Sequence, residues 1–295
     1  MAKKKIICLG EILWDALPKG IYLGGSPLNV ALNLDNLGID SKIVSAVGKD
    51  RLGRLALKSI EQKSLKSELI QLNNYPTSLA EVEIDEKGIP TYEIHENVAW
   101  DFIKKTDEIT TEINNSDFIV IGTLIFRNSS ANTVRELLKD YKGKVVVDVN
   151  LRKPFYSEEL LDEVLYLSNI VKFNRIELEE FLKWKKIVLD HEEALKWLSE
   201  KYDIDTVLLS RGEKGAYIYH EGELCRKGRY YVKVRDTVGA GDAFLAGAIY
   251  SLIKGKDAYD TVCFANAMGA FVTSRNGATP TLNMDKINIY LKYGK

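Results

Sequence analysis

Short β-branched, apolar runs alternate with longer amphipathic stretches along most of the chain. The apolar runs predict buried strands at residues 4–9, 42–47, 117–121, 144–149, 169–173 and 206–209. The amphipathic stretches predict helices at residues 26–37, 50–62, 131–141, 158–167, 176–183 and 192–202. Strands that alternate with helices in this way are typical of a mainly parallel sheet with helices on both faces, so we expect an α/β fold.

The first helix and the last quarter of the chain carry further local signals. Pro27 suits the first helical position, with Ser26 as the N-cap and Gly38 closing the helix. The last quarter is predicted to hold two more strands and two long apolar helices, at residues 215–219, 229–234, 240–253 and 257–274. The α/β pattern therefore continues to the end of the chain.

Two segments depart from this rhythm. Residues 11–23 carry a turn at 18–20, and residues 78–95 alternate apolar and polar side chains around a turn at 85–88. A hairpin with one apolar face does not belong in a buried parallel sheet. We interpret both segments as one small β lid on a single α/β domain, which caps an active site, forms an interface or does both. The lid is expected to consist of about residues 11–25 and 76–101.

Composition and charge exclude several classes of protein. Among 295 residues, 41 Lys and Arg against 42 Asp and Glu give a formal net charge of −1, which argues against a dedicated nucleic-acid binder. The longest apolar stretch, at residues 118–126, is too short to span a bilayer. The apolar run behind the basic start ends at Glu11, too early for a signal peptide. Three widely spaced cysteines without a CxxC pair favour reduced thiols and a cytoplasmic location.

The stretch with the clearest chemistry is DTVGAGDAF at residues 236–244, between a predicted strand and a predicted helix. Its two glycines let a ligand approach the backbone closely, and the helix that begins there directs free N–H groups toward an anion such as phosphate. Asp242 stands where its carboxylate could accept a proton from a hydroxyl at the same place. An anion cradle beside a carboxylate is what phosphoryl transfer to an alcohol requires.

The motif alone leaves other interpretations open. Asp is one of the best helix N-caps, and glycine-rich turns commonly precede helices. A dinucleotide-binding turn is disfavoured because Phe244 occupies the place of its third glycine. A P-loop is excluded because the sequence contains no GK[ST].

Two motifs together resemble the signatures of the ribokinase-type (PfkB) carbohydrate kinases. Residues 236–244 are similar to the C-terminal signature, and GGSPLNVALNLDNLG at residues 24–38 is similar to the N-terminal signature. The two lie far apart and in the expected order, and the resemblance extends over essentially the whole chain. It implies a ribokinase-like three-layer sandwich with a mainly parallel central sheet and a small β lid.

The resemblance assigns catalytic roles. Asp242 corresponds to the base that takes the proton of the sugar hydroxyl as this hydroxyl attacks the γ-phosphate of ATP. The backbone amides of Gly239, Ala240 and Gly241 correspond to the anion hole for the transferred phosphate. Glu177, in a stretch that resembles the NxxE motif, corresponds to the residue that orders Mg²⁺ and its waters. Taken alone, Glu177 is also an ordinary acid in the first turn of a helix, where acids are favoured.

The resemblance also places the nucleotide and a monovalent cation. Residues expected near the ATP phosphates and the adenine are Asn174, Ser210, Gly212, Gly215, Asn266 and Gly277. Many relatives bind a potassium ion in the same region, mostly through backbone oxygens. The corresponding residues here are Asp236, Val238, Val272, Arg275, Gly277 and Thr281. The expected cofactors are therefore ATP and Mg²⁺, with K⁺ as a further candidate.

The sugar is expected to bind close to the N-terminal motif. The residues that correspond to the sugar-reading groups of the family are Asp15, Gly24, Gly25 and Asn29. A carboxylate and an amide can each bridge neighbouring hydroxyls, and glycines let the sugar rest against bare backbone. Arg152, at the carboxyl end of a predicted strand, and Arg127 are further candidates in the acceptor site.

Three stretches are similar to fructokinase sequences and favour fructose as the acceptor. They are EILWD at residues 11–15, GGSPLNVA at 24–31 and HENVAWD at 95–101. The second departs from the fructokinase form GGAPxNVA at Ser26. Kinases of ribose, 2-keto-3-deoxygluconate or a nucleoside remain alternatives, as does a non-catalytic sugar- or nucleotide-sensing protein on the same fold. A sugar-phosphate acceptor is disfavoured because no basic cluster stands near Asp15 or Asn29.

Three further expectations concern Asp242, the lid and ATP. The helix N-terminus is expected to hold Asp242 ionised and therefore a weak base, which suffices when proton removal comes late in a loose transition state. The apolar face of the lid is expected to exceed what a small sugar covers, which favours a homodimer formed through the lid. Because the net charge is −1, attraction of ATP has to come from local groups.

Overall fold

The computed structural model describes residues 4–17, 20–84 and 90–294. The expected turn at 85–88, and residues 18–19 of the expected turn at 18–20, lie outside the described residues. Strands of the main sheet are β1 (Lys5–Leu9), β4 (Asp40–Gly48), β5 (Ile70–Asn73), β8 (Phe118–Gly122), β9 (Lys144–Asp148), β10 (Ile170–Asn174), β11 (Thr206–Ser210), β12 (Ala216–His220) and β13 (Glu223–Lys227).

These nine strands form one sheet in the order β13-β12-β11-β10-β9-β8-β1-β4-β5. From β11 to β5 all neighbouring strands are parallel, whereas β12 and β13 are added as antiparallel strands at one edge. The carboxyl ends of the seven parallel strands therefore meet at one edge of the sheet, where α/β proteins place their ligands.

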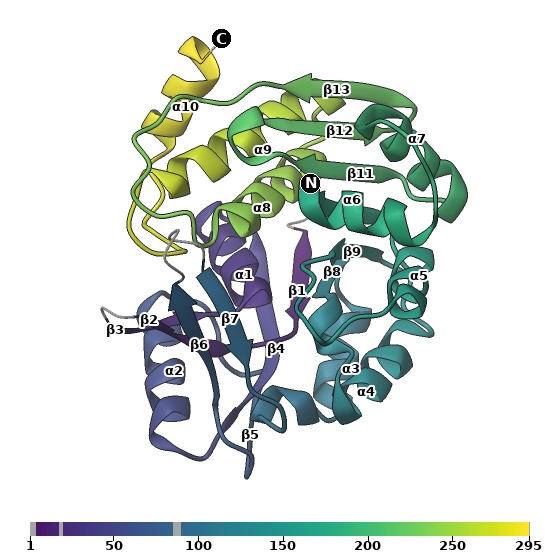
Figure 1. Ribbon diagram of the computed structural model, residues 1–295. Helices are drawn as coiled ribbons and strands as arrows, with labels where there is room; N and C mark the ends of the chain where they lie inside the picture. Colours follow the sequence, from purple (N-terminus) through teal and green to yellow (C-terminus); the bar gives the residue numbers. More distant parts are fainter. Residues whose placement is uncertain (1–3, 18–19, 85–89, 295) are drawn as a thin grey trace.

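Helices cover both faces of this sheet (Figure 1). One face is covered by α1 (Ser26–Asn36), α2 (Arg51–Gln62), α8 (Ala240–Ile253) and α9 (Ala258–Thr273). The other face is covered by α3 (Asp107–Asn114), α4 (Asn128–Leu138), α5 (Glu158–Tyr166), α6 (Arg175–Trp184) and α7 (His191–Tyr202). The remaining helical segments are α10 (Met284–Tyr293) and the 3₁₀ turns η1 (Ala99–Phe102), η2 (Thr123–Ile125) and η3 (Gly212–Lys214).

Alternation along the central strand β1 shows why three layers form. Ile6 and Cys8 belong to the core that packs on α1 and α8, whereas Ile7 and Leu9 belong to the core on the opposite face. Successive side chains of a strand point to opposite faces, so a strand that is apolar throughout has to be covered on both sides. The expected three-layer α/β sandwich is confirmed.

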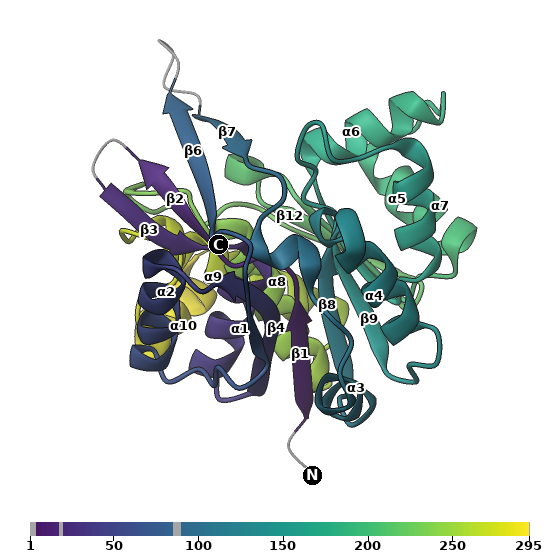
Figure 2. The ribbon, with the colours of Figure 1, turned by 90° about the horizontal axis from the view of Figure 1, so that it is seen from below.

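The lid is a separate four-stranded sheet that projects from the body (Figure 2). Its strands, in spatial order, are β3 (Gly20–Gly24), β2 (Leu13–Leu17), β6 (Ser78–Ile84) and β7 (Pro90–Ile94). The pairs β2–β3 and β6–β7 are antiparallel, and β2 pairs with β6 in parallel. The two segments that departed from the α/β rhythm therefore join in one small sheet, as expected.

Two aromatic residues near the base of the lid are buried. Trp14 of β2 donates a hydrogen bond from its indole nitrogen to the carbonyl of Leu52, at 3.2 Å, and Trp100 of η1 is fully buried. Both rings are therefore part of the hydrophobic interior that joins lid and body, and neither lines the large cavity described below.

The structure corrects two local predictions. Helix α1 begins at Ser26 itself, with Gly25 as the N-cap, because the Ser26 side chain bonds to a distant carboxylate instead of to its own helix. Residues 229–234 form no strand; the strand that pairs with β12 lies earlier in the chain, at β13. Helices α3 and α10 and strand β5 were not predicted, and most of the predicted elements agree with the structure to within one or two residues.

Candidate active site

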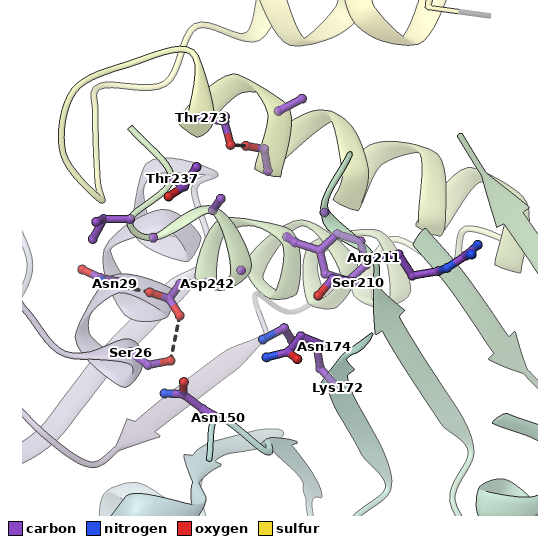
Figure 3. A pocket seen from close by; sticks show the side chains of 18 of the residues that line it. Ser26, Asn29, Asn150, Lys172, Asn174, Ser210, Arg211, Thr237, Asp242 and Thr273 are labelled. Carbon is purple, nitrogen blue, oxygen red and sulfur yellow. Dashed lines mark hydrogen bonds between the residues drawn. The ribbon is translucent and has the colours of Figure 1, made fainter. Parts of the chain in front are cut away.

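A cavity of about 940 Å³ opens at the carboxyl ends of the parallel strands. Its walls come from the lid, from the start of α1, from the ends of β9, β10 and β11, and from the glycine turn before α8. Such a position is where the fold class places a ligand site, and the volume suits a small molecule together with a cofactor. Figure 3 shows part of this cavity, with Asp242 close to Ser26 and Asn29.

The glycine turn puts the start of α8 against the cavity. Gly239 is the N-cap of α8 and has a φ of 75°, a left-handed conformation that favours glycine. A Cβ atom added there would lie 2.6 Å from the Cα of Ala278, so the site also lacks room for a side chain. Ala240, Gly241 and Asp242 form the first turn of α8, and all of them line the cavity.

The carboxylate of Asp242 is held by two side chains of α1. The hydroxyl of Ser26 donates to Oδ1 at 2.7 Å, and the amide of Asn29 donates to Oδ2 at 2.8 Å. Figure 3 shows both bonds reaching across from α1 to α8. The two signature motifs, distant in sequence, are thus joined through one carboxylate.

The helix N-terminus was expected to hold Asp242 ionised and a weak base, but the pKa of this carboxyl is raised above its ordinary value. Burial raises the pKa of this carboxyl, and the nearby negative charge of Asp148 raises it further. Hydrogen bonds from Asn29 and Ser26 and the charge of Lys172 act in the opposite direction but do not cancel the effect of burial. A raised pKa makes Asp242 a stronger base, which brings it closer to the range that suits proton transfer at neutral pH.

Lys172 is a site residue that the sequence analysis missed. Its ammonium lies 2.7 Å from Oδ1 of Asp148 in a buried ion pair, and a Cβ atom added at Gly241 would lie 3.3 Å from the same ammonium. Burial acts to lower the pKa of Lys172, but the charges of Asp148, Glu177 and Asp242 outweigh it and raise the pKa. The only signal in the sequence is a lysine inside the apolar run of β10.

Around Asp15 the structure brings together the expected sugar-reading groups. Asp15, Gly25, Asn29 and Arg152 all line the cavity. A Cβ atom at Gly24 would lie 2.5 Å from the Asp15 carboxylate, which explains that glycine although it does not itself line the cavity. Burial raises the pKa of Asp15 to about 6, against the opposing charge of Arg152.

Glu11 is a second acidic group of this end that sequence reasoning did not assign. One of its carboxylate oxygens accepts a hydrogen bond from the backbone N–H of Ser26 at 3.0 Å. Burial raises the pKa of Glu11 to about 7, so its carboxyl titrates near neutrality. Glu11 thereby fixes the backbone at the start of α1, directly beside the bond from Ser26 to Asp242.

Glu177 and Asn174 cap the start of α6. The Asn174 side chain accepts from the backbone of Glu177 at 3.0 Å, and the Glu177 carboxylate accepts from the backbone of Asn174 at 2.8 Å and of Leu151 at 3.2 Å. Asn174 lines the cavity, whereas Glu177 is buried behind it. Burial raises the pKa of Glu177, and Lys172 opposes that change. The hydrogen bonds therefore give Glu177 a structural role: it caps the start of α6 and fixes the backbone at Leu151.

The described residues contain no group of three or more His, Cys, Asp or Glu side chains placed to hold a metal ion by themselves. Mg²⁺ at a nucleotide site needs less, because it keeps several waters and takes most of its remaining ligands from phosphates and one or two carboxylates. Asp148 and Glu177 both lie near Lys172, but neither lines the cavity: Asp148 is paired with Lys172, and both carboxylate oxygens of Glu177 accept backbone hydrogen bonds. A nucleotide-borne Mg²⁺ would therefore be held here mainly by phosphate oxygens and water, with carboxylates acting through its waters.

The expected nucleotide residues mostly lie along the other end of the cavity. Ser210, Gly212, Gly215 and Asn266 all line it, together with Asn174. Gly215 has a φ of 83°, and a Cβ atom there would meet the carbonyl of Lys227 at 2.0 Å, so the turn after β11 requires this glycine. Gly277 does not line the cavity.

The residues expected around a potassium ion are brought together only in part. The Asp236 carboxylate accepts from the backbone N–H groups of Val238 and Gly277, each at 3.0 Å, and so ties two loops together. Val272 is fully buried in α9, and Thr281 is exposed. The Arg275 guanidinium lies over the ring of Phe271. The cation site stays a prediction.

Arg127 lies apart from the cavity lining. Its guanidinium forms a buried ion pair with Asp101 at 2.7 Å and lies 4.4 Å from the ring centroid of Trp100 and 4.1 Å from that of Phe155. It also donates to the carbonyl of His95, so it connects the end of the lid segment to the body. The structure thus gives Arg127 contacts within the protein interior.

Fold and site together define a class of protein: an α/β protein with a small β sheet beside a cavity, in which the first turn of a helix lies next to a buried carboxylate. The chain belongs to the pfkB family of carbohydrate kinases, whose family model matches residues 20–284. It is therefore a phosphotransferase that acts on a sugar hydroxyl.

Individual relatives differ in what they are named for. A fructokinase of Salmonella typhimurium is 26% identical, over 94% of this chain and 96% of that protein. An ATP-dependent 6-phosphofructokinase of Thermoanaerobacterium thermosaccharolyticum is 28% identical, over 86% of this chain and 83% of that protein. Among solved structures, a double mutant of the fructokinase from Vibrio cholerae O395, bound to fructose, ADP and potassium ion, matches with a TM-score of 0.82 and 24% identity, covering 98% of both chains. Among the described residues, no helix combines the length and the apolar character needed to cross a membrane.

Proposed function

We propose that this protein transfers the γ-phosphate of ATP to a hydroxyl of D-fructose, giving fructose 6-phosphate. The observation that carries the proposal is the position of Asp242, whose carboxylate faces the cavity, is fixed by two donors from α1 and follows directly on the glycine turn. In this proposal the base and the anion cradle both lie within the first turn of α8. The fructokinase of Salmonella typhimurium supports fructose as the acceptor.

Asp242 acts as the base. It accepts the proton of the sugar hydroxyl while the sugar oxygen forms its bond to the γ-phosphorus and the bond to ADP breaks. Burial raises the pKa of Asp242, which strengthens it as a base, and the bonds from Ser26 and Asn29 keep its carboxylate oriented. General-base catalysis of this kind contributes about 10²- to 10⁴-fold to the rate.

The backbone at Gly239, Ala240 and Gly241 binds the transferred phosphate, because the first turn of a helix offers free N–H groups and a positive dipole end. The ammonium of Lys172, which is paired with Asp148, lies beside Gly241 as a further donor to the phosphate. Mg²⁺, when bound with ATP, would supply further charge neutralisation on the phosphate oxygens, and Glu177, by its resemblance to the acid of the NxxE motif, is the residue expected to order its waters. Attraction of ATP is therefore local, as the net charge of −1 requires.

The sugar binds between Asp15, Asn29 and Arg152, all of which line the cavity. The lid strands that carry Asp15, Ala80 and Ile94 form one wall, so a bound sugar is shielded from water that would compete as acceptor. Potassium binding at the loops joined by Asp236 is part of the proposal; the Vibrio cholerae structure with a potassium ion supports it.

A sugar phosphate is the second candidate for the acceptor, because a relative is named as an ATP-dependent 6-phosphofructokinase. Near Asp15, the cavity lining contains the cationic side chain of Arg152 and the acidic side chains of Glu11 and Asp15 itself. An uncharged sugar fits this balance better than a phosphorylated one.

The acceptor is tested by measuring ADP release with fructose, fructose 6-phosphate, ribose, tagatose, 2-keto-3-deoxygluconate and adenosine under identical conditions. We expect fructose to give the highest kcat/KM. A higher value with another acceptor would replace fructose while leaving the kinase assignment intact, and ATP hydrolysis without any acceptor effect would contradict the proposal.

A homodimer formed through the lid also belongs to this proposal. Strand β3 is an edge of the lid sheet, and its Ile21 and Tyr22 expose 46% and 45% of their surface. An open strand edge with exposed apolar side chains is suited to pairing with a second copy. Light scattering after size exclusion should give twice the mass of one chain, and a monomer at working concentration would contradict it.

A further inference from the structure

The hydroxyl of Ser26 lies between two carboxylates. It donates to Oδ1 of Asp242 at 2.7 Å, and Oδ2 of Asp148 is 3.5 Å from the same oxygen. A serine hydroxyl carries one proton, so it can donate to only one of the two acids at a time. At present geometry Asp242 receives the short bond.

The other hydrogen bonds of these two carboxylates and of the Ser26 backbone do not involve the Ser26 hydroxyl. The second oxygen of Asp242 is held by Asn29, and the second oxygen of Asp148 is held by Lys172. The backbone of Ser26 is fixed by Glu11, and Pro27 follows it in the first turn of α1. Rotation of the Ser26 side chain can therefore redistribute the hydrogen bond while all of these contacts stay in place.

We propose that Ser26 is a positioning residue that works as a hydrogen-bond switch between Asp242 and Asp148. While Asp242 is ionised, Ser26 stabilises its negative charge and lowers its pKa. When Asp242 takes the proton of the sugar hydroxyl, it becomes a poorer acceptor, and the Ser26 hydroxyl turns to Asp148. Ser26 keeps its own proton throughout, and the transferred proton stays on Asp242. The inference rests on the proposed role of Asp242 as base.

The switch acts among several other charges. Asp242 interacts with Asp148 of β9 and Lys172 of β10, and its charge also acts on Glu11 and Asp15 at the lid side. Arg152 acts on Glu11 and Asp15, and Glu177 of α6 acts on Lys172. A test has to keep all of these groups and remove the Ser26 hydroxyl alone, which Ser26→Ala does.

The experiment compares the pH dependence of kcat/KM for the sugar in wild type, Ser26→Ala and Ser26→Thr. The base has to be ionised, so activity falls as the pH drops through the pKa of Asp242. Loss of a hydrogen bond to a charged group should move this acid limb of Ser26→Ala to higher pH by about one unit, because the ionised form is no longer stabilised. Ser26→Thr, which keeps the hydroxyl, should return the limb toward the wild-type position.

Ser41 provides the matched control. It is a buried serine whose hydroxyl donates to the carbonyl of Ala31 in the same helix α1, at 2.8 Å, and not to a carboxylate. Ser41→Ala should destabilise the fold to a similar extent and leave the acid limb where it is. An unchanged limb in Ser26→Ala, or an equal shift in Ser41→Ala, would overturn the proposal, since a purely structural contact predicts one of these two results.

A second readout does not need turnover. The carboxyl ¹³C resonance of Asp242, assigned with the help of Asp242→Asn, should titrate at higher pH in Ser26→Ala than in wild type, and equal midpoints would overturn the switch. If no acceptor gives ADP release, the proposed function fails, and this titration still decides whether Ser26 controls the pKa of Asp242.

Discussion

The ammonium of Lys172 lies 2.7 Å from a carboxylate oxygen of Asp148, and the two residues are only 5% and 2% exposed. The ammonium of this pair lies beside Gly241, in the glycine turn that lines the cavity. A buried charge is tolerated when it is paired, and removal of one partner leaves the other uncompensated. This relationship links the stability of the fold to the electrostatics of the site.

Replacement of Lys172 by Met should therefore have two effects. It should lower the free energy of unfolding by about 3–5 kcal/mol, because Asp148 then stays buried without its partner. It should also move the acid limb of the activity to higher pH, since the charge of Lys172 lowers the pKa of Asp242. Denaturant unfolding and a pH profile measure the two effects.

Lys144→Met is the control for this change. Lys144 pairs with Asp205 at 3.1 Å, but both side chains are about half exposed, and such pairs contribute less than about 1 kcal/mol. A Lys172→Met protein with the stability and pH profile of Lys144→Met would show that the buried pair has no influence on the site.

Gly239→Ala should disturb the anion cradle. Its left-handed φ of 75° costs a non-glycine residue about 1–2 kcal/mol, and the added Cβ would also collide with Ala278. Gly255→Ala shares the left-handed φ, at 68°, but its Cβ would meet no atom within 4 Å. We expect Gly255→Ala to lose stability alone and Gly239→Ala to lose turnover as well, as steady-state kinetics and thermal unfolding can show. Equal kinetics for the two variants would contradict the cradle.

Sugar binding should depend on pH through Asp15. Burial raises its pKa to about 6, so the carboxylate is ionised above that pH and becomes protonated as the pH falls through it. If the ionised form accepts hydrogen bonds from the sugar, KM for the sugar should rise below about pH 6. Asp15→Asn should have a high KM that no longer changes over this range. A wild-type KM that is flat from pH 5 to 8 would exclude this role for Asp15.

Substitutions of the two arginines that were predicted in the acceptor site should have clearly different effects on sugar binding and on stability. Arg152 lines the cavity, so Arg152→Met should raise KM for the sugar more than it lowers stability. Arg127 is paired with Asp101 in the interior, so Arg127→Met should lower the free energy of unfolding by about 3–5 kcal/mol. Calorimetry and sugar titrations on both variants make the comparison. The reverse order of effects would return Arg127 to the acceptor site.

How far the sequence determined these conclusions differs between fold and site. Periodicity predicted the parallel sheet, and the limits of α8 agree with the structure at both ends. The segment after β13 was misjudged because residues 229–234 are rich in β-branched and aromatic side chains, yet they pair with no strand, and β13 takes the place beside β12. Tertiary pairing, which periodicity does not contain, decided that case.

In the site, the motifs identified groups but not their charge states. The glycine turn could be located because its two glycines and an aspartate stand at a predicted strand-to-helix junction, and Asn29 because of the resemblance to the N-terminal signature. The raised pKa of Asp242 could not be predicted from the motifs, because it depends on burial and on the charge of Asp148, which lies 94 positions earlier in the chain (242 − 148). Lys172 was missed for the same reason. A single lysine in an apolar strand can be recognised as a site residue only when the carboxylates around it are known.

The most direct test of the central assignment is the turnover of Asp242→Asn with fructose and ATP. Asp260→Asn, an exposed acid in α9 paired with Lys256, is the control. We expect Asp242→Asn to lose about 10²- to 10⁴-fold in kcat while it still binds ATP, as measured by calorimetry, and Asp260→Asn to stay close to wild type. An Asp242→Asn enzyme that turns over within a few fold of wild type would contradict Asp242 as the base.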